Sequence, residues 1–425
     1  MGKNVSKRAS QQEGNVESGL SQALREFVRE RLYDTVLVSG LAHVTEVLES
    51  ERTRVCGPRY RHTEARQTVR SGHAPSSLVL GGRLINVKRP RVRTTSGEEV
   101  SLPSWEAWSA RDPLEARAIE QMLVGVSTRK YQRSLEETPD RVVSRGTSRS
   151  AVSRRFVRGT TRQLDRLMAR DLSEMDLKVL MLDGVHFAGD HVIVAAVGVD
   201  SEGRKHVLGL WEGATENKAT CTALLENLVE RGLPTDRTIL VVIDGGKALY
   251  RAVRSIFGRR ALIQRCQEHK KRNVLDALPE DRRGSVKRAL QDALKAEDPE
   301  RAERLLKNLA RSLDEQHPGA AASLREGLDD LLTVKRLGLG GSSLERTLSN
   351  TNVIENLIGQ VRELSGRVKR WKSGRMILRW SAAGALEAER GFRRLKGYRQ
   401  MTKLVVALQA HDAAIDENTE GRKAA

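Results

Sequence analysis

The sequence predicts a mixed α/β protein in which a sheet-containing core is preceded and followed by helical regions. From residue 177 to residue 263, short apolar runs of strand length alternate with segments whose apolar residues have helical spacing. Outside that interval, apolar residues mostly recur every three or four positions, as in amphipathic helices. A chain of 425 residues is long enough for two to four domains.

The first part of the chain combines a polar tail with helices and a β-hairpin. Residues 1–20 are rich in Gln, Asn and Ser and are expected to be disordered. In residues 21–110, apolar spacing first predicts one or two helices. Short apolar runs within 77–87 then flank the step Gly81-Gly82, which predicts a hairpin whose second strand continues into a basic stretch.

Residues 111–172 are predicted to form a helix-turn-helix region that binds DNA. One helical pattern ends near Gly125, a second helix could begin at Ser127 or Thr128, and residues 146–156 open a third with small polar and Arg residues. From 129 to 168, 11 Lys and Arg stand against 4 Asp and Glu. A solvated pair of basic helices would give the same pattern.

Residues 173–279 are predicted to form the first part of the α/β core. Strands are expected at 177–182, 191–199, 205–211, 238–243 and 261–263, and helices at 219–229 and 250–257. Three consecutive strands, a helix, a strand, a helix and a strand is the element order of a ribonuclease H-like core.

The rest of the chain is predicted to be helical. In residues 280–345, apolar positions repeat with helical spacing and Asp298-Pro299 starts a helix, so this segment is expected to be an all-helical insertion. Residues 346–425 are expected to complete the core with helices, a third acidic residue and a basic tail. The Gly-rich stretch at 338–341 is not a P-loop, because it lacks the Gly-Lys-Ser/Thr ending.

Composition restricts the possible partners and the compartment. Lys and Arg number 74 against 55 Asp and Glu, and the net charge of +19 favours a polyanion, nucleic acid before membrane lipid. Aromatic residues at 4% disfavour a single-strand binder that stacks bases. No apolar run has the length of a membrane span. The three cysteines are far apart, which is typical of a reducing, cytoplasmic setting.

Two carboxylates follow similar apolar strands. Asp183 and Asp244 are each preceded by an apolar run and followed by Gly. If these strands are adjacent and parallel, the two carboxylates converge at one edge and can hold Mg²⁺, which prefers oxygen ligands. Asp-Gly can equally end a strand as a simple turn. Glu355 could supply the third carboxylate of a two-metal site, although Asn352-x-x-Glu355 is also a capping-box arrangement.

Cys266 and His269 offer two further metal ligands. A structural zinc site needs four ligands, and no second Cys/His pair follows at a suitable spacing. Cys266 can simply be a buried thiol. His269 lies directly after the fifth predicted strand, so it could contact a phosphate or position water near the acidic residues.

Four motifs together resemble the mutator-type DDE transposases of bacterial insertion sequences. They span 182–186, 243–249, 264–273 and 351–356, and the similarity runs in order over roughly residues 60–400. The resemblance implies that Asp183, Asp244 and Glu355 are the catalytic, metal-binding triad. It also implies that Cys266 and His269 form the Cys-x-x-His element of the catalytic site, and that a helical insertion separates Asp244 from Glu355.

The resemblance implies a DNA transposase that binds terminal inverted repeats and performs Mg²⁺-dependent cleavage and strand transfer, with two ions and Mn²⁺ as a substitute. Two alternatives remain open: a DNA-binding regulator or relic without cleavage, and a ribonuclease H-like nuclease without strand transfer. The expected partners are double-stranded DNA of transposon ends and target, and a second copy in a synaptic homodimer, without a membrane. The expected location is the cytoplasm, at the nucleoid when DNA is bound.

The residues expected to contact DNA are Arg129, Lys130, Arg149, Ser150, Arg154, Arg155, Arg158, Lys270, Arg272, Lys369, Arg370, Lys372 and Arg375.

Overall fold

The structure, a computed structural model, divides into two compact units, residues 1–159 and 160–425. The two units are described separately below. The residues that the structure describes are 32, 34–61, 66–80, 83–110, 113–135, 142, 144–145, 148–187, 191–213, 217–366, 368 and 370–423.

The first unit contains a helix over residues 34–56 and a small antiparallel sheet. Its long strands are β1 (Thr68–Leu80) and β2 (Arg83–Thr94), and β3 (Glu99–Val100) and β4 (Ser144–Arg145) both pair with β2. Leu80 pairs with Arg83, which confirms the hairpin predicted around the Gly-Gly step. The helix packs on this sheet through buried Leu48, Cys56 and Val92.

Further helices follow in the first unit: α2 (Pro103–Ala110), α3 (Pro113–Leu123) and α4 (Arg149–Met168), which continues into the second unit. Gly125 has a φ of +98°, and the amides of Gly125 and Val126 donate to Met122 and Gln121. These bonds confirm the predicted helix end, because they form the double bond of a Schellman motif.

The second helix expected at Ser127 is not formed. Residues 128–135 are instead a turn and a single 3₁₀ turn, η1 (Tyr131–Ser134). The tight turn brings Tyr131 into a small core with Ala118 and Val152, where it is fully buried. Burial of this aromatic side chain overrides the weak helical pattern of the segment.

The second unit is built on a five-stranded sheet in the order β7-β6-β5-β8-β9. β5 (Leu177–Phe187), β6 (His191–Asp200) and β7 (Lys205–Gly213) are antiparallel neighbours, whereas β8 (Ile239–Ile243) and β9 (Ala261–Arg265) run parallel to β5. All five predicted strands are present. β5 continues to Phe187, farther than expected, because it pairs with β6 along its whole length.

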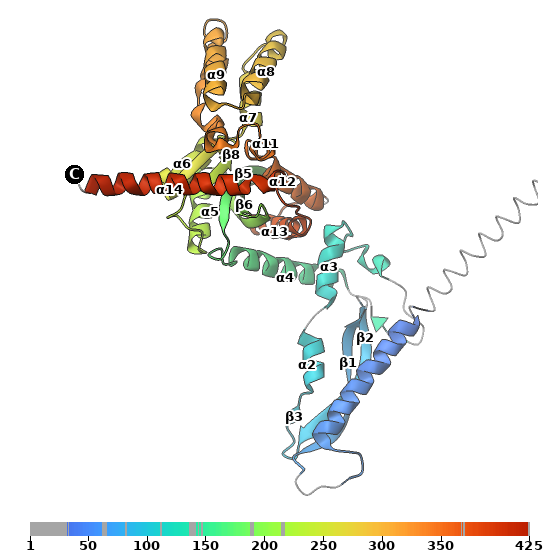
Figure 1. Cartoon of the computed structure of the whole chain (residues 1–425). Coiled ribbons are helices and arrows are strands. Elements are labelled where there is room, and N and C mark those ends of the chain that lie inside the picture. The colour runs from blue at the N-terminus through green and yellow to red at the C-terminus, as the bar shows by residue number, and fades with distance from the viewer. Residues whose placement is uncertain are drawn as a thin grey trace, which may run out of the picture. The chain divides into compact units, whose positions relative to one another are not determined.

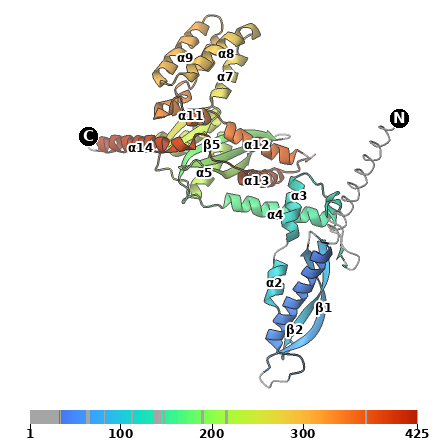
Figure 2. The same cartoon turned by 45° about the vertical axis from the view of Figure 1, so that its right-hand side comes forward.

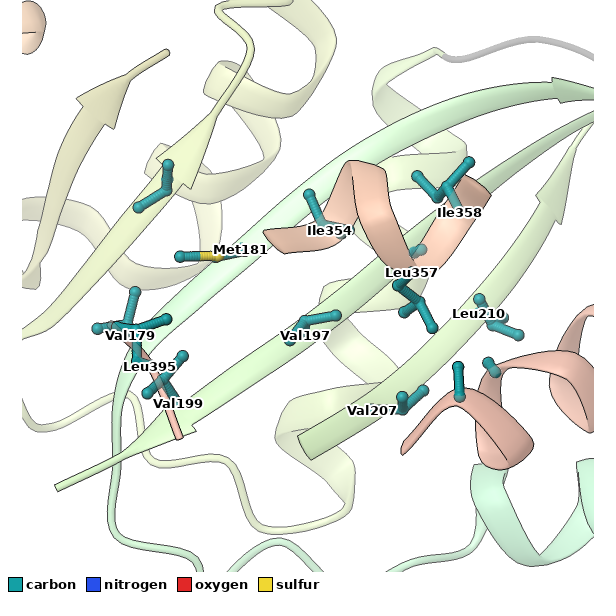
Figure 3. Close-up of a cluster of buried hydrophobic side chains, with 14 of the residues drawn as sticks. Val179, Met181, Val197, Val199, Val207, Leu210, Ile354, Leu357, Ile358 and Leu395 are labelled. Carbon is teal, nitrogen blue, oxygen red and sulfur yellow. The ribbon is translucent and has the colours of Figure 1, made fainter. Parts of the chain in front are cut away.

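Helices cover both faces of this sheet. α5 (Lys218–Glu230) and α6 (Lys247–Phe257) pack on one face, over side chains that include Leu180 and Val241. The opposite face is covered by α12 (Asn352–Ser365), α13 (Gly374–Arg390) and α14 (Met401–Lys423) (Figures 1 and 2). Figure 3 shows Ile354 and Leu357 of α12 above the strands that carry Val179, Met181 and Val197.

A helical segment is inserted between β9 and α12. It comprises α7 (Gln267–Asp276), α8 (Glu280–Lys295), α9 (Pro299–Leu313), α10 (Pro318–Arg325) and α11 (Ser343–Leu348). α8 and α9 stand away from the sheet as a pair (Figure 1), and α7 to α10 have an apolar core of their own. As predicted, Asp298 caps α9, accepting from the Arg301 amide at 2.7 Å. No helix within the described ranges is long and apolar enough to cross a membrane.

Candidate active site

Asp183 lies inside a strand and not at its end. Asp-Gly was expected to end the apolar run, but β5 continues for four residues past Asp183. Met181 and Val185, two positions before and after it, both belong to the apolar cluster beneath α12. Because side chains alternate along a strand, Asp183 faces α12 as well, and it is 9% exposed.

Asp244 follows β8 directly and lies level with Asp183. β5 and β8 are parallel neighbours, and Met181 pairs with Val242, so continuing the register by two residues sets Asp183 beside Asp244. Oδ1 of Asp244 accepts from the Gly246 amide at 2.7 Å, which makes the tight turn that Asp-Gly also predicted. Asp244 can therefore form the turn and still be a candidate metal ligand.

Only glycine fits at position 245, because the Arg265 side chain packs directly against this turn. Its φ is +103°, and a Cβ at this position would lie 1.9 Å from Nε of Arg265. The Arg265 side chain is 9% exposed, and its guanidinium donates to the carbonyls of Gly245 and Glu326. Arg265 thus fixes the turn that carries Asp244, a role that the sequence patterns did not identify.

Glu355 lies in the first turn of α12, on the helix that covers the face of Asp183. The capping box is not formed, because the Asn352 amide bonds to Asn350 Oδ1. Oε1 of Glu355 instead accepts from the Thr351 hydroxyl at 2.5 Å. The carboxylate is therefore directed toward the start of α7.

Thr351 joins Glu355 to the Cys-x-x-His element. Its hydroxyl is 3.3 Å from Sγ of Cys266 and 3.4 Å from Nδ1 of His269. His269 Nδ1 is 3.7 Å from Glu355 Oε1. The amide of Gln267 donates to the carbonyl of Ser349 at 2.9 Å, so α7 and α12 begin side by side. The sequence patterns did not identify Thr351 as a site residue. Its position four residues before Glu355, at the start of a helix, does indicate that the two side chains can meet.

The cluster keeps His269 protonated at neutral pH. Its hydrogen bond to Cys266 is the largest cause, and the negative charges of Cys266, Asp244 and Glu355 add to it, which raises the pKa of His269 to about 9 against the opposing effect of burial. Burial opposes ionisation of the Cys266 thiol, but hydrogen bonds with His269 and Thr351 outweigh it and lower the pKa of Cys266. The site therefore presents an imidazolium beside carboxylates.

The three proposed ligands of Mg²⁺ have suitable chemistry. Asp183, Asp244 and Glu355 offer only carboxylate oxygens, and they belong to two neighbouring strands and to the helix over the face of Asp183, which fits a hard cation. Among the described residues, ligand atoms of a different trio, Cys266, His269 and Glu355, lie within 4.8 Å of one another. The two aspartates are outside that trio.

Most of the residues expected to contact DNA are on the surface. Arg155 is half-buried, and Lys369 lies outside the described residues. The exposed ones are Arg129, Lys130, Arg149, Ser150, Arg154 and Arg158 in the first unit, and Arg272, Arg370, Lys372 and Arg375 in the second.

Lys270 is not on the surface. It is 2% exposed, and its ammonium donates to the carbonyls of Ser323 and Glu326. Burial lowers the pKa of Lys270 to about 8. This lysine ties α7 to the end of α10, and these elements enclose the ammonium that was expected to contact DNA.

Comparison with known proteins gives a consistent result. A sequence profile described as "Transposase, Mutator family" matches residues 15–379. The chain is 28% identical over 358 residues to the transposase for insertion sequence element IS256 in transposon Tn4001 of Staphylococcus aureus, which covers 80% of this chain and 87% of that protein. It is 27% identical over 368 residues to the transposase for insertion sequence element ISRM5 of Rhizobium meliloti, covering 84% and 89%.

Proposed function

We propose that this chain, which belongs to the Mutator family of transposases, binds the terminal inverted repeats of its element and catalyses metal-dependent DNA cleavage and strand transfer. Asp183, Asp244 and Glu355 are the proposed catalytic residues. One observation carries the assignment: the register of β5 and β8 aligns the two aspartates, and α12 brings Glu355 over the same face.

The strand order supports a ribonuclease H-like core for this activity. Three antiparallel strands followed by two parallel ones, with helices on both faces, is the arrangement expected from the element order of the sequence. In this proposal residues 173–279 and 346–425 provide the catalytic core and residues 111–172 bind the transposon end. Residues 280–345 are the main part of the insertion, to which α7 and the end of α11 also belong.

The three carboxylates would hold two Mg²⁺ ions, or Mn²⁺ in their place. When bound, such ions supply the charge that activates a water or a 3′-hydroxyl and stabilises the leaving oxygen. Thr351 orients the Glu355 carboxylate through its hydroxyl. The His269 imidazolium, which interacts with the charges of Asp244 and Glu355, is suited to hold a non-bridging oxygen of the scissile phosphate.

Exposed basic residues would position the DNA. Arg149, Arg154 and Arg158 lie along α4, and Arg370 and Lys372 precede α13. Guanidinium and ammonium groups bind phosphates without regard to sequence, and those that reach a groove can also read base edges. Two ends must be held at once for strand transfer, so the active species is proposed to be a homodimer.

The test is a set of isosteric substitutions. Asp183→Asn, Asp244→Asn and Glu355→Gln should each lower Mg²⁺-dependent cleavage of end DNA by at least about 100-fold and leave end binding unchanged, because only the metal-binding charge is removed. Asp236→Asn, an exposed acid before β8, is the matched control and should cleave normally. An active Asp244→Asn protein would contradict the proposal. Cleavage without joining of precut ends would identify a nuclease instead of a transposase.

A further inference from the structure

We infer that Cys266, His269 and Glu355 form a binding site for a thiophilic divalent cation such as Zn²⁺. This site shares Glu355 with the proposed Mg²⁺ site but differs from it in chemistry. Its ligands are a sulfur, a nitrogen and an oxygen, whereas the Mg²⁺ site offers oxygens alone. Zn²⁺ binds such mixed S/N/O sets, and Mg²⁺ avoids thiolates.

The distances in the cluster are close to those of a tetrahedral zinc site. With bonds of about 2.3 Å to sulfur and about 2.0 Å to nitrogen and oxygen, neighbouring ligand atoms are roughly 3.3–3.6 Å apart. His269 Nδ1 and Glu355 Oε1 are already 3.7 Å apart. All three ligand atoms lie within 4.8 Å of one another. The bound cation would displace the proton of His269, and movements of the side chains would bring the remaining distances to those of the site.

The backbone holds the ligands in this arrangement. Cys266 is fully buried at the junction of β9 and α7, and His269 follows one turn later on the same helix. Glu355 comes from α12, whose start is bonded to the start of α7 through Gln267 and Ser349. The ligands therefore come from two helix starts that are fixed against each other.

The fourth coordination position would be open to solvent. The side chains of His269 and Glu355 are 26% and 42% exposed, so an ion can enter from their side and keep a water ligand. Thr351, within reach of all three ligands, is the natural outer-sphere partner that orients them. Three protein ligands and one open position describe an exchangeable site more than a permanent structural one.

The consequence for activity rests on the proposed function, whereas the binding itself does not. A cation held by Cys266 and His269 would draw Glu355 away from the two aspartates. Cleavage would then lack its third carboxylate. Zn²⁺ is thus expected to inhibit the Mg²⁺-dependent reaction reversibly, at concentrations far below that of Mg²⁺.

Cobalt provides a direct test of binding with the full-length protein. Co²⁺ titration of wild type should give a thiolate-to-cobalt absorption band that saturates at one ion per chain, and Zn²⁺ should displace it. Cys266→Ser should lose the band, and Cys221→Ser should retain it, because Cys221 is equally buried but lies on α5. Glu355→Gln, at a half-exposed position, should weaken Co²⁺ binding at least about tenfold. No band in wild type, or a band retained in Cys266→Ser, would overturn the inference.

A second pair of measurements separates this inference from the proposed function. Asp183→Asn and Asp244→Asn should bind Co²⁺ like wild type while failing to cleave DNA. Excess Zn²⁺ should suppress wild-type cleavage, and a chelator followed by Mg²⁺ should restore it. If the aspartate variants bind Co²⁺ normally and also cleave DNA normally, the metal site is upheld and the proposed catalytic triad is rejected. Cleavage that is unaffected by saturating Zn²⁺ would refute the shared use of Glu355.

Discussion

Thr351 has one hydroxyl hydrogen and two acceptors within reach, on Cys266 and Glu355, and its hydroxyl oxygen is also 3.4 Å from Nδ1 of His269. The shortest contact, to Glu355, uses that hydrogen, so the hydroxyl oxygen remains available to accept from the protonated His269. Asp183 and Asp244 could be singled out from the sequence, because each follows an apolar run, whereas the spacing around Glu355 equally fitted a helix cap and its proposed role came from the resemblance. The link through Thr351 could not be predicted, since it exists only where α7 and α12 begin side by side.

Two substitutions of Thr351 distinguish the effect of its hydroxyl group from the effect of its packing. Thr351→Val keeps the shape but leaves Glu355 without its donor, so cleavage should fall by about 10- to 100-fold, in line with a lost hydrogen bond to a charged group. Thr351→Ser should retain most of the activity. Steady-state cleavage rates and DNA binding of both variants would be compared. Normal cleavage by Thr351→Val together with a loss in Thr351→Ser would indicate that the methyl group, and hence packing, is what matters.

His269 makes folding stability depend on pH. Its pKa is raised to about 9 in the folded protein, so its stabilisation is complete below its ordinary value of 6.5 and is lost as pH rises through 9. The difference in unfolding free energy between wild type and His269→Gln should therefore shrink from at most about 3 kcal/mol near pH 6 to near zero by about pH 10. Urea unfolding at several pH values measures it. A difference independent of pH would disprove the charged state.

At the scale of elements, the strands were predictable and their exact extents were not. β5, β6 and β8 consist of long apolar runs, which suit strands buried on both faces. Asp183-Gly184 interrupts such a run and was expected to end it, yet β5 continues because β6 offers paired backbone as far as His191. The helix expected at Ser127 failed for a similar reason, since the burial of Tyr131 was decided by residues distant in sequence.

The Gly-rich segment after α10 contains a buried ion pair. Lys335, on the kinked helical turn η4 (Lys335–Leu339), bonds Glu345 of α11, and the two side chains are 1% and 6% exposed. Glu345 also accepts from the Gly341 amide, and its own amide is capped by Ser342. The Gly-rich segment, which is not a P-loop, thus holds the start of α11 in place through these bonds.

Removing one partner of this pair should be costly. Glu345→Gln leaves Lys335 charged in the interior and should lower the free energy of unfolding by about 3 kcal/mol. Glu300→Gln, which breaks an exposed pair with Arg304, should change it by less than about 0.5 kcal/mol. Urea denaturation of both variants would be measured under identical conditions. Similar effects from the two substitutions would mean that the Lys335–Glu345 pair is not buried in the folded protein.

For the whole molecule, the charge of +19 is concentrated in the segments 129–168 and 360–400. These segments carry the exposed basic residues of α4 and of the start of α13. Composition alone suggested a polyanion as partner. Membership of a transposase family now makes DNA the partner to test, and the exposed basic groups are the proposed contacts.

Binding to end DNA should weaken steeply with salt, because bound phosphates release their counterions. If six to ten phosphates are contacted, affinity should fall roughly 10³- to 10⁵-fold between 50 and 200 mM salt. Arg154→Ala should reduce the slope of log affinity against log salt by about 1. Fluorescence anisotropy at several salt concentrations gives both values. A shallow slope would show that the basic surfaces do not bind the phosphate backbone.

The insertion leaves the core through α7 and returns to it just before Glu355, and the Gln267 amide bonds the Ser349 carbonyl where the two ends meet. Its exit and return points are therefore neighbours, and its tip at the α8–α9 turn is remote from the carboxylates. Loop-closure entropy rises only slowly with length, so a segment attached in this way can be extended or nicked at its tip at small thermodynamic cost. Two separately produced fragments divided at that turn should consequently reassemble into a working enzyme, which would make the α8–α9 turn a convenient point at which to place transposition under external control.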